Sequence, residues 1–177
     1  MEKIKMYIYI VLTFLFISLF DVNTPKKTLS FTYPVNNIYI TSGFGYRFLG
    51  YYHFHNGTDF AASIGTPLYS IEDGIVVFCG FNGAYGYTVK IKHDNTYTSV
   101  YCHVSGNLLV KKGDLVYKND VIANVGPAKL PYNATTYFLY RGVKSNGMTT
   151  GPHLHFSLIK NGKYVDPMSI KYEKVAP

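Results

Sequence analysis

Short runs of alternating hydrophobic and polar residues cover most of this chain, a period that is typical of β-strands. Glycine, asparagine, aspartate and proline separate the runs and favour turns. Residues 86–93 and 97–103 flank the sequence DNT, so we expect them to form a β-hairpin, with residues 75–81 pairing with its first strand. Residues 110–126 alternate well enough for two more short strands. The pattern predicts a mainly β fold of antiparallel sheets with short hairpins.

One of the predicted strands carries two histidines. In the sequence TGPHLHFSL, residues 150–158, His153 and His155 lie on either side of Leu154. Residues two apart in a strand point to the same face, so both imidazoles project together while Leu154 and Phe156 project the opposite way. This spacing predicts one wall of a polar site backed by an apolar core. Two histidines on a solvated face are the alternative, and the motif alone leaves it open.

The composition supports a single β-rich domain. The chain has 177 residues, 17% of them aromatic, and 16 glycines, which suits strands better than a helical bundle. The formal net charge of +7 indicates a negatively charged binding partner, such as nucleic acid, an anionic membrane or a phosphate-bearing cell wall. The lysines occur singly or in pairs, with no basic run or RNP-like motif, so we expect no nucleic-acid partner.

The N-terminus resembles an export sequence. Two lysines precede an uncharged, largely apolar run over residues 6–20 that Asp21 closes. Such a run fits the hydrophobic region of a signal peptide better than a membrane span, which needs about 20 residues, yet no A-x-A-like cleavage site follows. We expect residues 1–22 to be a signal peptide or an N-terminal membrane anchor, with a buried core helix as the minor alternative. Residues 23–30 are then a linker, and the remainder is exported, either anchored in the membrane facing outward or secreted to the periplasm or cell wall.

The two cysteines are expected to be free thiols. Cys79 and Cys102 lie in predicted strands with a third strand between them, which separates them by about 9 to 10 Å. A disulfide needs Cα atoms within about 7 Å. We therefore predict two unpaired, mostly buried thiols.

A second histidine-rich motif, HFHNGTDFAA, contains His53, His55 and Asp59. Imidazoles and carboxylates are ligands that zinc prefers, and three protein ligands with a fourth position left open form the catalytic pattern. Two ligands from this motif and one from HLH would complete such a set. Surface histidines, and an aspartate that caps the turn after NGT, are the alternatives for each residue taken singly. The combination of the motifs favours a shared metal site.

Five segments carry a resemblance to a known family: TSGFGYR, HNGTDFAASIGTPLYSIEDGIV, YGYTVKIKHDNTYTSVYCHVS, VKKGDLVYKNDVIANVG and TTGPHLHFSLIKNGKYVDP. In this order they resemble the lysostaphin-type (LytM-like) zinc endopeptidases, which cut peptide cross-links of bacterial peptidoglycan. The resemblance implies the lysostaphin-like peptidase fold (the duplicated hybrid motif), with antiparallel sheets and a narrow groove over a zinc site. It also implies Zn2+ as the cofactor and peptidoglycan peptide stems or cross-bridges as the partner.

The resemblance also assigns roles to individual residues. It makes His55, Asp59 and His155 the zinc ligands, and it makes His103 and His153 a catalytic pair outside the ligand set. His93 falls near a hairpin turn where the family often has a histidine, and we expect it to be structural. His53 receives no role.

The resemblance places the peptidase domain at residues 31–170, followed by a C-terminal tail at residues 171–177. Within the domain, residues 127–149 lack a sustained period, so we expect a long insertion loop before the HLH strand. The predicted function is a zinc-dependent endopeptidase that hydrolyses peptide cross-links of peptidoglycan by means of a metal-activated water. The rival is a non-catalytic wall-binding or scaffold module of the same fold, which the presence of all five site residues disfavours.

Overall fold

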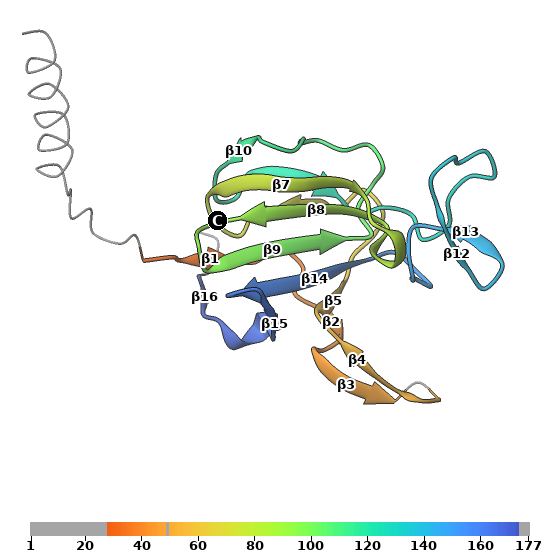
Figure 1. Cartoon of the computed structure of the whole chain (residues 1–177), viewed down its shortest axis with the longest axis horizontal. Helices are drawn as coiled ribbons and strands as arrows, with labels where there is room; N and C mark the ends of the chain where they lie inside the picture. The colour runs from red at the N-terminus through yellow and green to blue at the C-terminus, as the bar shows by residue number, and fades with distance from the viewer. Residues whose placement is uncertain (1–27, 49, 174–177) are drawn as a thin grey trace, which may run out of the picture.

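Strands make up nearly all the regular structure of the described residues. The computed structural model describes residues 28–48 and 50–173 (Figure 1), so the expected signal peptide or anchor and most of the expected linker lie outside the described residues. Helical structure in the described part is limited to two 3-10 turns, η1 (Gly83–Tyr85) and η2 (Pro167–Ser169). No helix in the described ranges is long and apolar enough to cross a membrane. The predicted mainly β fold with antiparallel sheets is confirmed.

One large sheet forms the frame of the molecule (Figure 1). All of its strand pairs are antiparallel. In order across the sheet, the strands are β10 (Leu115–Val116), β7 (Gly74–Phe81), β8 (Tyr87–Lys92), β9 (Tyr97–Cys102), β14 (His153–Lys160), β5 (Thr58–Ala61) and β2 (Ile40–Ser42), with β15 (Lys163–Val165) paired to β14.

The predicted hairpin of β8 and β9 is present, and β7 pairs with β8 as expected. Asp94 closes the turn, because its Oδ1 accepts hydrogen bonds from the backbone N–H groups of Thr96 and Tyr97. Both cysteines are free, as predicted, and β8 lies between their strands. Cys102 is buried, whereas Cys79 is half-buried and its thiol is directed at the carbonyl oxygen of Val110.

Strand β14 alternates between the core and a polar face, as its sequence predicts. Leu154, Phe156 and Leu158 are fully buried in the hydrophobic core. That core also contains side chains of the small antiparallel pair β6 (Pro67–Tyr69) and β11 (Val121–Asn124). His153 and His155 therefore project together from the opposite face, on a strand whose position the apolar side chains fix.

The expected C-terminal tail is not wholly irregular. Its residues β16 (Tyr172–Glu173) pair in parallel with β1 (Phe31–Thr32), at the start of the predicted domain. Tyr172 also stacks on Tyr33, with 4.4 Å between ring centroids. The two ends of the described chain therefore lie side by side, and the packed domain extends through residue 173.

The expected long loop over residues 127–149 contains a hairpin of its own, which corrects the prediction of an irregular segment. Strands β12 (Phe138–Tyr140) and β13 (Val143–Ser145) pair antiparallel around Arg141 and Gly142, which both have positive φ angles. Two positive φ values are what a tight two-residue hairpin turn requires. Three-residue strands are too short to show a period, which is why the sequence pattern missed them.

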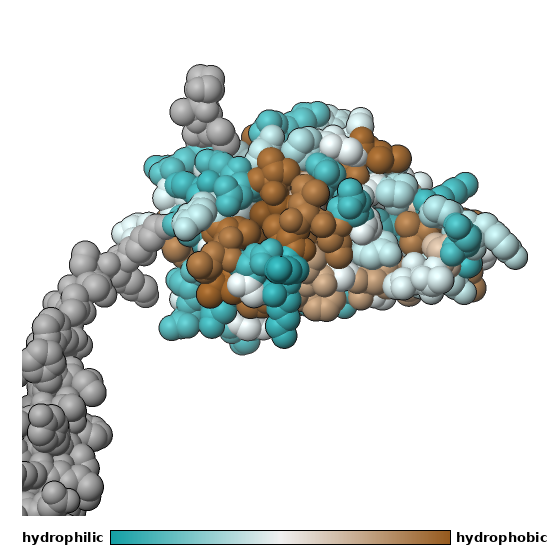
Figure 2. Space-filling view, turned by 90° about the horizontal axis from the view of Figure 1, so that it is seen from above, coloured by the Kyte–Doolittle hydropathy of each residue, from teal (hydrophilic) through white to brown (hydrophobic). Residues whose placement is uncertain are grey.

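Two hairpins project from the body of the molecule: β12–β13 at the right of Figure 1, and the pair β3 (Gly45–Phe48) and β4 (Tyr52–His55) below the sheet. Elsewhere, hydrophobic side chains gather on the face seen from above, over the β7–β10 edge of the large sheet (Figure 2). The exposed large hydrophobic residues of these two strands are Ile75, Val77 and Leu115. The candidate site lies beside the β3–β4 hairpin, whose last residue is His55.

Candidate metal centre and active site

Strand register places two of the predicted ligands opposite each other. In the antiparallel pair of β14 and β5, His155 lies directly across from Asp59. Directly opposed residues have Cβ atoms about 4.5 to 5.5 Å apart, close enough for their side chains to meet. His55, the last residue of β4, precedes Asp59 by four residues, and the turn through Asn56 and Gly57 brings it back against the same two side chains.

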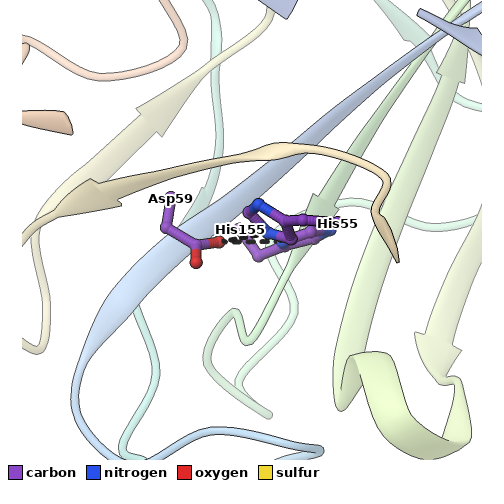
Figure 3. A group of neighbouring side chains, drawn as sticks. All are labelled: His55, Asp59 and His155. Carbon is purple, nitrogen blue, oxygen red and sulfur yellow. Dashed lines mark hydrogen bonds and ion pairs between the residues drawn. The ribbon is translucent and has the colours of Figure 1, made fainter. Parts of the chain in front are cut away.

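The ligand atoms of His55, Asp59 and His155 point toward one another (Figure 3). His55 Nε2 lies 3.2 Å from Asp59 Oδ1 and 2.9 Å from His155 Nδ1, and the last two atoms are 2.8 Å apart. A tetrahedral zinc with bonds of about 2.0 Å has ligand atoms about 3.3 Å apart. Two imidazole nitrogens and a carboxylate oxygen at this spacing could hold one metal ion.

Further hydrogen bonds orient these ligand atoms. His55 Nδ1 donates to the carbonyl oxygen of Gly43 at 2.6 Å, which leaves Nε2 unprotonated and available to a metal. His155 is turned the other way: its Nε2 is hydrogen-bonded to Ser157 Oγ at 3.1 Å, and Nδ1 faces the ligand group. The second oxygen of Asp59, Oδ2, lies 3.5 Å from Arg47 Nη1. Each ligand is therefore held by a partner outside the set.

Burial and the neighbouring groups shift the proton affinities of the cluster. Burial by itself would raise the pKa of Asp59, but hydrogen bonds with His155 and His55 outweigh it and hold this pKa well below its usual range. Burial lowers the pKa of His155, although Asp59 opposes the shift. An ionised carboxylate beside a neutral imidazole is the state that binds a divalent cation.

The two histidines assigned to catalysis lie beside the ligand group. His103 follows β9, whose last residue, Cys102, pairs with His155. The rings of His103 and His153 are 4.9 Å apart between centroids, and the His103 ring is 6.1 Å from that of His155. His153 Nε2 lies 3.7 Å from Asp59 Oδ1. All five predicted site residues therefore meet in one place.

His103 sits in an unusual environment. Its side chain is buried. Burial, and to a smaller extent the charge of the nearby His153, lower the pKa of His103 to about 3. Its backbone φ is 58°, in the left-handed region that non-glycine residues seldom adopt. Strained residues of this kind persist only where surrounding structure fixes them, and they gather at functional sites.

These residues surround a cavity of about 270 Å3. Its lining includes Arg47, Tyr85 and Met148, which sequence reasoning missed. Arg47 opposes His53 in the β3–β4 hairpin, and its Nε donates to His53 Nε2 at 2.8 Å. His53 therefore binds Arg47, whereas His55 faces the ligand group.

His93 lies outside this cavity. Its Nδ1 donates to the carbonyl oxygen of Asp73, and its Nε2 is hydrogen-bonded to Ser99 Oγ at 2.7 Å. Both ring nitrogens are occupied within the fold, which agrees with the structural role expected for this residue.

Proteins of known function are similar to this chain in sequence. The peptidoglycan DD-endopeptidase ShyA of Vibrio cholerae is 40% identical over 114 residues, which cover 64% of this chain and 22% of ShyA. ShyB of the same organism is 37% identical over 142 residues, 77% of this chain and 29% of ShyB. This chain therefore spans less than a third of the length of these curated relatives.

Solved structures agree with these relatives. A zinc-containing peptidase from Vibrio cholerae superimposes with a TM-score of 0.65 and 34% identity, covering 82% of this chain and 41% of that one. The catalytic domain of lysostaphin from Staphylococcus simulans gives a TM-score of 0.57 and 28% identity, covering 76% and 92% respectively. The model of peptidase family M23 matches residues 53–167, most of the described domain and all five site residues. The chain belongs to peptidase family M23.

Proposed function

We propose that this protein is a zinc-dependent endopeptidase that hydrolyses peptide cross-links of bacterial peptidoglycan. The observation that carries the proposal is the convergence of His55 Nε2, Asp59 Oδ1 and His155 Nδ1 within 3.2 Å of one another, with two more histidines beside them. Family membership supports the reaction class. Relatives named as peptidoglycan DD-endopeptidases support the substrate.

His55, Asp59 and His155 would hold the zinc ion. Their donor atoms fit it, because the set combines two imidazole nitrogens with one carboxylate oxygen at tetrahedral spacing. When bound, zinc supplies a Lewis acid that polarises the scissile carbonyl and makes water a nucleophile near neutral pH. The partners of the ligands, Gly43 and Ser157 among them, keep the unprotonated nitrogens directed at the metal position.

His103 and His153 would move the protons. Each donates its Nδ1 hydrogen to a backbone carbonyl, that of Asn146 for His103 and that of Gly151 for His153. Each Nε2 therefore has a free lone pair and can take a proton from the attacking water. The imidazolium that forms can return this proton to the leaving amine. Neutral imidazole at the start of the cycle agrees with the lowered pKa of His103.

The rival function, a non-catalytic wall-binding or scaffold module, predicts that at least part of this machinery would be missing. Here the ligand set and both flanking histidines are present and oriented. The cavity remains open beside them, with a volume of about 270 Å3. The arrangement favours catalysis over binding alone.

The location proposed for the protein follows from its substrate and its N-terminus. Residues 1–22 have the composition of a signal peptide or membrane anchor. We propose that the peptidase part is exported, where peptidoglycan lies, and that the net charge of +7 favours contact with an anionic wall. Protease accessibility of intact cells and of spheroplasts would test this location.

The test of function uses the full chain and two kinds of purified cell wall. We expect zinc near one equivalent per chain, loss of hydrolysis with a strong chelator, and recovery on adding zinc. Walls with direct D-alanyl cross-links should release new muropeptides by mass spectrometry, whereas walls with glycine bridges should be poorer substrates. Undiminished hydrolysis by the metal-free protein would overturn the zinc mechanism. A zinc-loaded protein that releases nothing from either wall would favour the binding module.

A further inference from the structure

The two histidines outside the ligand set bind the backbone of one short segment. His103 Nδ1 donates to the carbonyl oxygen of Asn146 at 2.7 Å, and His153 Nδ1 donates to that of Gly151 at 2.9 Å. A carbonyl oxygen only accepts, so each ring carries its hydrogen on Nδ1 and leaves Nε2 unprotonated. Residues 146–151 therefore set the same tautomer in both rings.

Asn146 anchors this segment. It is fully buried, and its side chain makes two hydrogen bonds to backbone groups of other segments. Its Oδ1 accepts from the N–H of Tyr87 at 2.8 Å, and its Nδ2 donates to the carbonyl of Val104 at 2.9 Å. Its own N–H donates to the carbonyl of Ala128 at 2.9 Å. Three hydrogen bonds therefore fix the position of the Asn146 carbonyl, which accepts the hydrogen bond from His103.

Two glycines make room for the anchor. A Cβ atom on Gly86 would overlap the carbonyl and side-chain oxygens of Asn146, and one on Gly126 would lie 2.7 Å from Asn146 Nδ2. Gly86 also has a positive φ of 65°, a conformation that side-chain-bearing residues avoid. The surroundings are therefore shaped to the asparagine side chain rather than merely tolerant of it.

Hydrogen bonds around Asn146 also hold the strained backbone of His103. With φ at 58°, His103 donates its N–H to the carbonyl of Tyr85 and accepts at its carbonyl from the N–H of Gly126. The Nδ2 of Asn146 binds the next carbonyl along, that of Val104. Asn146 therefore restrains both the ring and the adjacent backbone of His103.

We propose that Asn146 is a positioning residue that fixes His103 in the tautomer with unprotonated Nε2. The inference rests on the proposed function for its effect on rate, although the tautomer can be measured without any reaction. Asn146 also anchors the C-terminal end of the insertion. Hairpin β12–β13 extends from the body, whereas Asn146, which follows it, is held beside the site by its hydrogen bond to Val104.

The test compares Asn146→Ala with a matched control, Asp94→Ala, in the full zinc-loaded chain. Asp94 also holds two backbone N–H groups with one side chain, but it lies in the turn at the opposite end of β8 and β9. The measurements are nitrogen-15 NMR of the histidine rings, zinc content, unfolding temperature, and kcat and KM on a purified cross-linked muropeptide dimer. His103→Gln identifies the His103 resonances by their loss.

In the wild type we expect Nδ1 of His103 to be protonated and Nε2 to be bare. Asn146→Ala should average the two tautomers of His103 and lower kcat about 10- to 100-fold, the usual effect of losing a partner that orients a site residue. Its KM and zinc content should change little. Asp94→Ala should lower the unfolding temperature without changing tautomer or kcat.

Three outcomes would overturn the proposal: a wild-type His103 protonated at Nε2, an Asn146→Ala variant with unchanged tautomer and kcat, or an equal loss of kcat in Asp94→Ala. If Asn146→Ala does not fold, Asn146→Ser takes its place, since a hydroxyl can keep one of the two bonds. A wild type that fails to cut the muropeptide would instead refute the proposed function, while the ring resonances would still decide the role of Asn146.

Discussion

The most direct perturbation of the metal centre from outside the ligand set is Gly57→Ala. Gly57 lies in the turn between His55 and Asp59, beneath the ring of His155. An added Cβ would lie 2.6 Å from the carbonyl oxygen of Phe156, and 2.7 and 2.8 Å from Cε1 and Nε2 of His155. Real Cβ contacts are almost never under 3.0 Å, so either strand β14 or the His155 ring must move.

The size of the effect follows from the cost of overpacking. Forcing one extra methyl group into a packed site costs about 1 to 3 kcal/mol. If the ring of His155 moves, this cost falls on the metal site and weakens zinc affinity by about 5- to 150-fold, since 1.4 kcal/mol corresponds to a factor of ten. If β14 moves instead, the metal-free protein loses stability, and its unfolding temperature should fall by about 2 to 12 °C.

The assay measures both quantities on the full chain: zinc affinity by competition with a chromophoric chelator, and thermal unfolding of the metal-free protein. Gly43→Ala is the matched control, because nothing lies within 4 Å of a Cβ placed there and its carbonyl still accepts from His55. The control should resemble the wild type in both measurements. A Gly57→Ala protein with wild-type zinc affinity and wild-type unfolding temperature would refute the packing argument.

Three further predictions concern the histidines and the thiols. His155→Ala should weaken zinc affinity by more than the 10- to 100-fold that is typical of losing a residue hydrogen-bonded to a ligand. His153→Ala should keep its zinc and lose about 10²- to 10⁴-fold in rate. Zinc content and hydrolysis measure both effects, and zinc retained by His155→Ala would reverse the two roles. Since the pKa of His103 falls to about 3 on folding, the unfolded chain binds more protons between about pH 6.5 and 3. The metal-free protein should therefore lose stability as the pH falls through this window, and denaturant titrations should show a shallower loss for His103→Gln. Burial raises the pKa of Cys79 and raises that of Cys102 to about 12. A thiol reagent should therefore react slowly with the native protein, whereas both thiols should react readily after denaturation. A fast reaction of Cys102 in the native protein would contradict its burial.

Local periodicity was sufficient for the strands and for part of the site. Alternation in residues 150–158 places His153 and His155 on one face whatever the rest of the chain does, because side-chain direction in a strand is set by the backbone itself. The DNT turn likewise predicts the pairing of β8 with β9. The short strands of β12–β13 escaped this kind of reasoning, since three residues are too few to show a period.

The choice between His53 and His55 needed both family resemblance and structure. The two residues are two apart in β4, so alternation cannot separate them. The fold separates them by what lies opposite: His53 meets Arg47 in the β3–β4 hairpin, and His55 meets Asp59 and His155 beyond its end. The contact of His55 with His155 joins residues 100 apart in the sequence, so no local pattern encodes it.

The sequence by itself thus determined which residue types are available and which of them share a strand face. Tertiary structure decided which nitrogen of each ring faces the metal position, and which backbone carbonyl holds the other nitrogen. The bond from His103 to Asn146 spans 43 residues, and that from His155 to Asp59 spans 96. A tautomer depends on the partner of a single atom, and partners at such separations exist only after the sheet and the insertion have packed together.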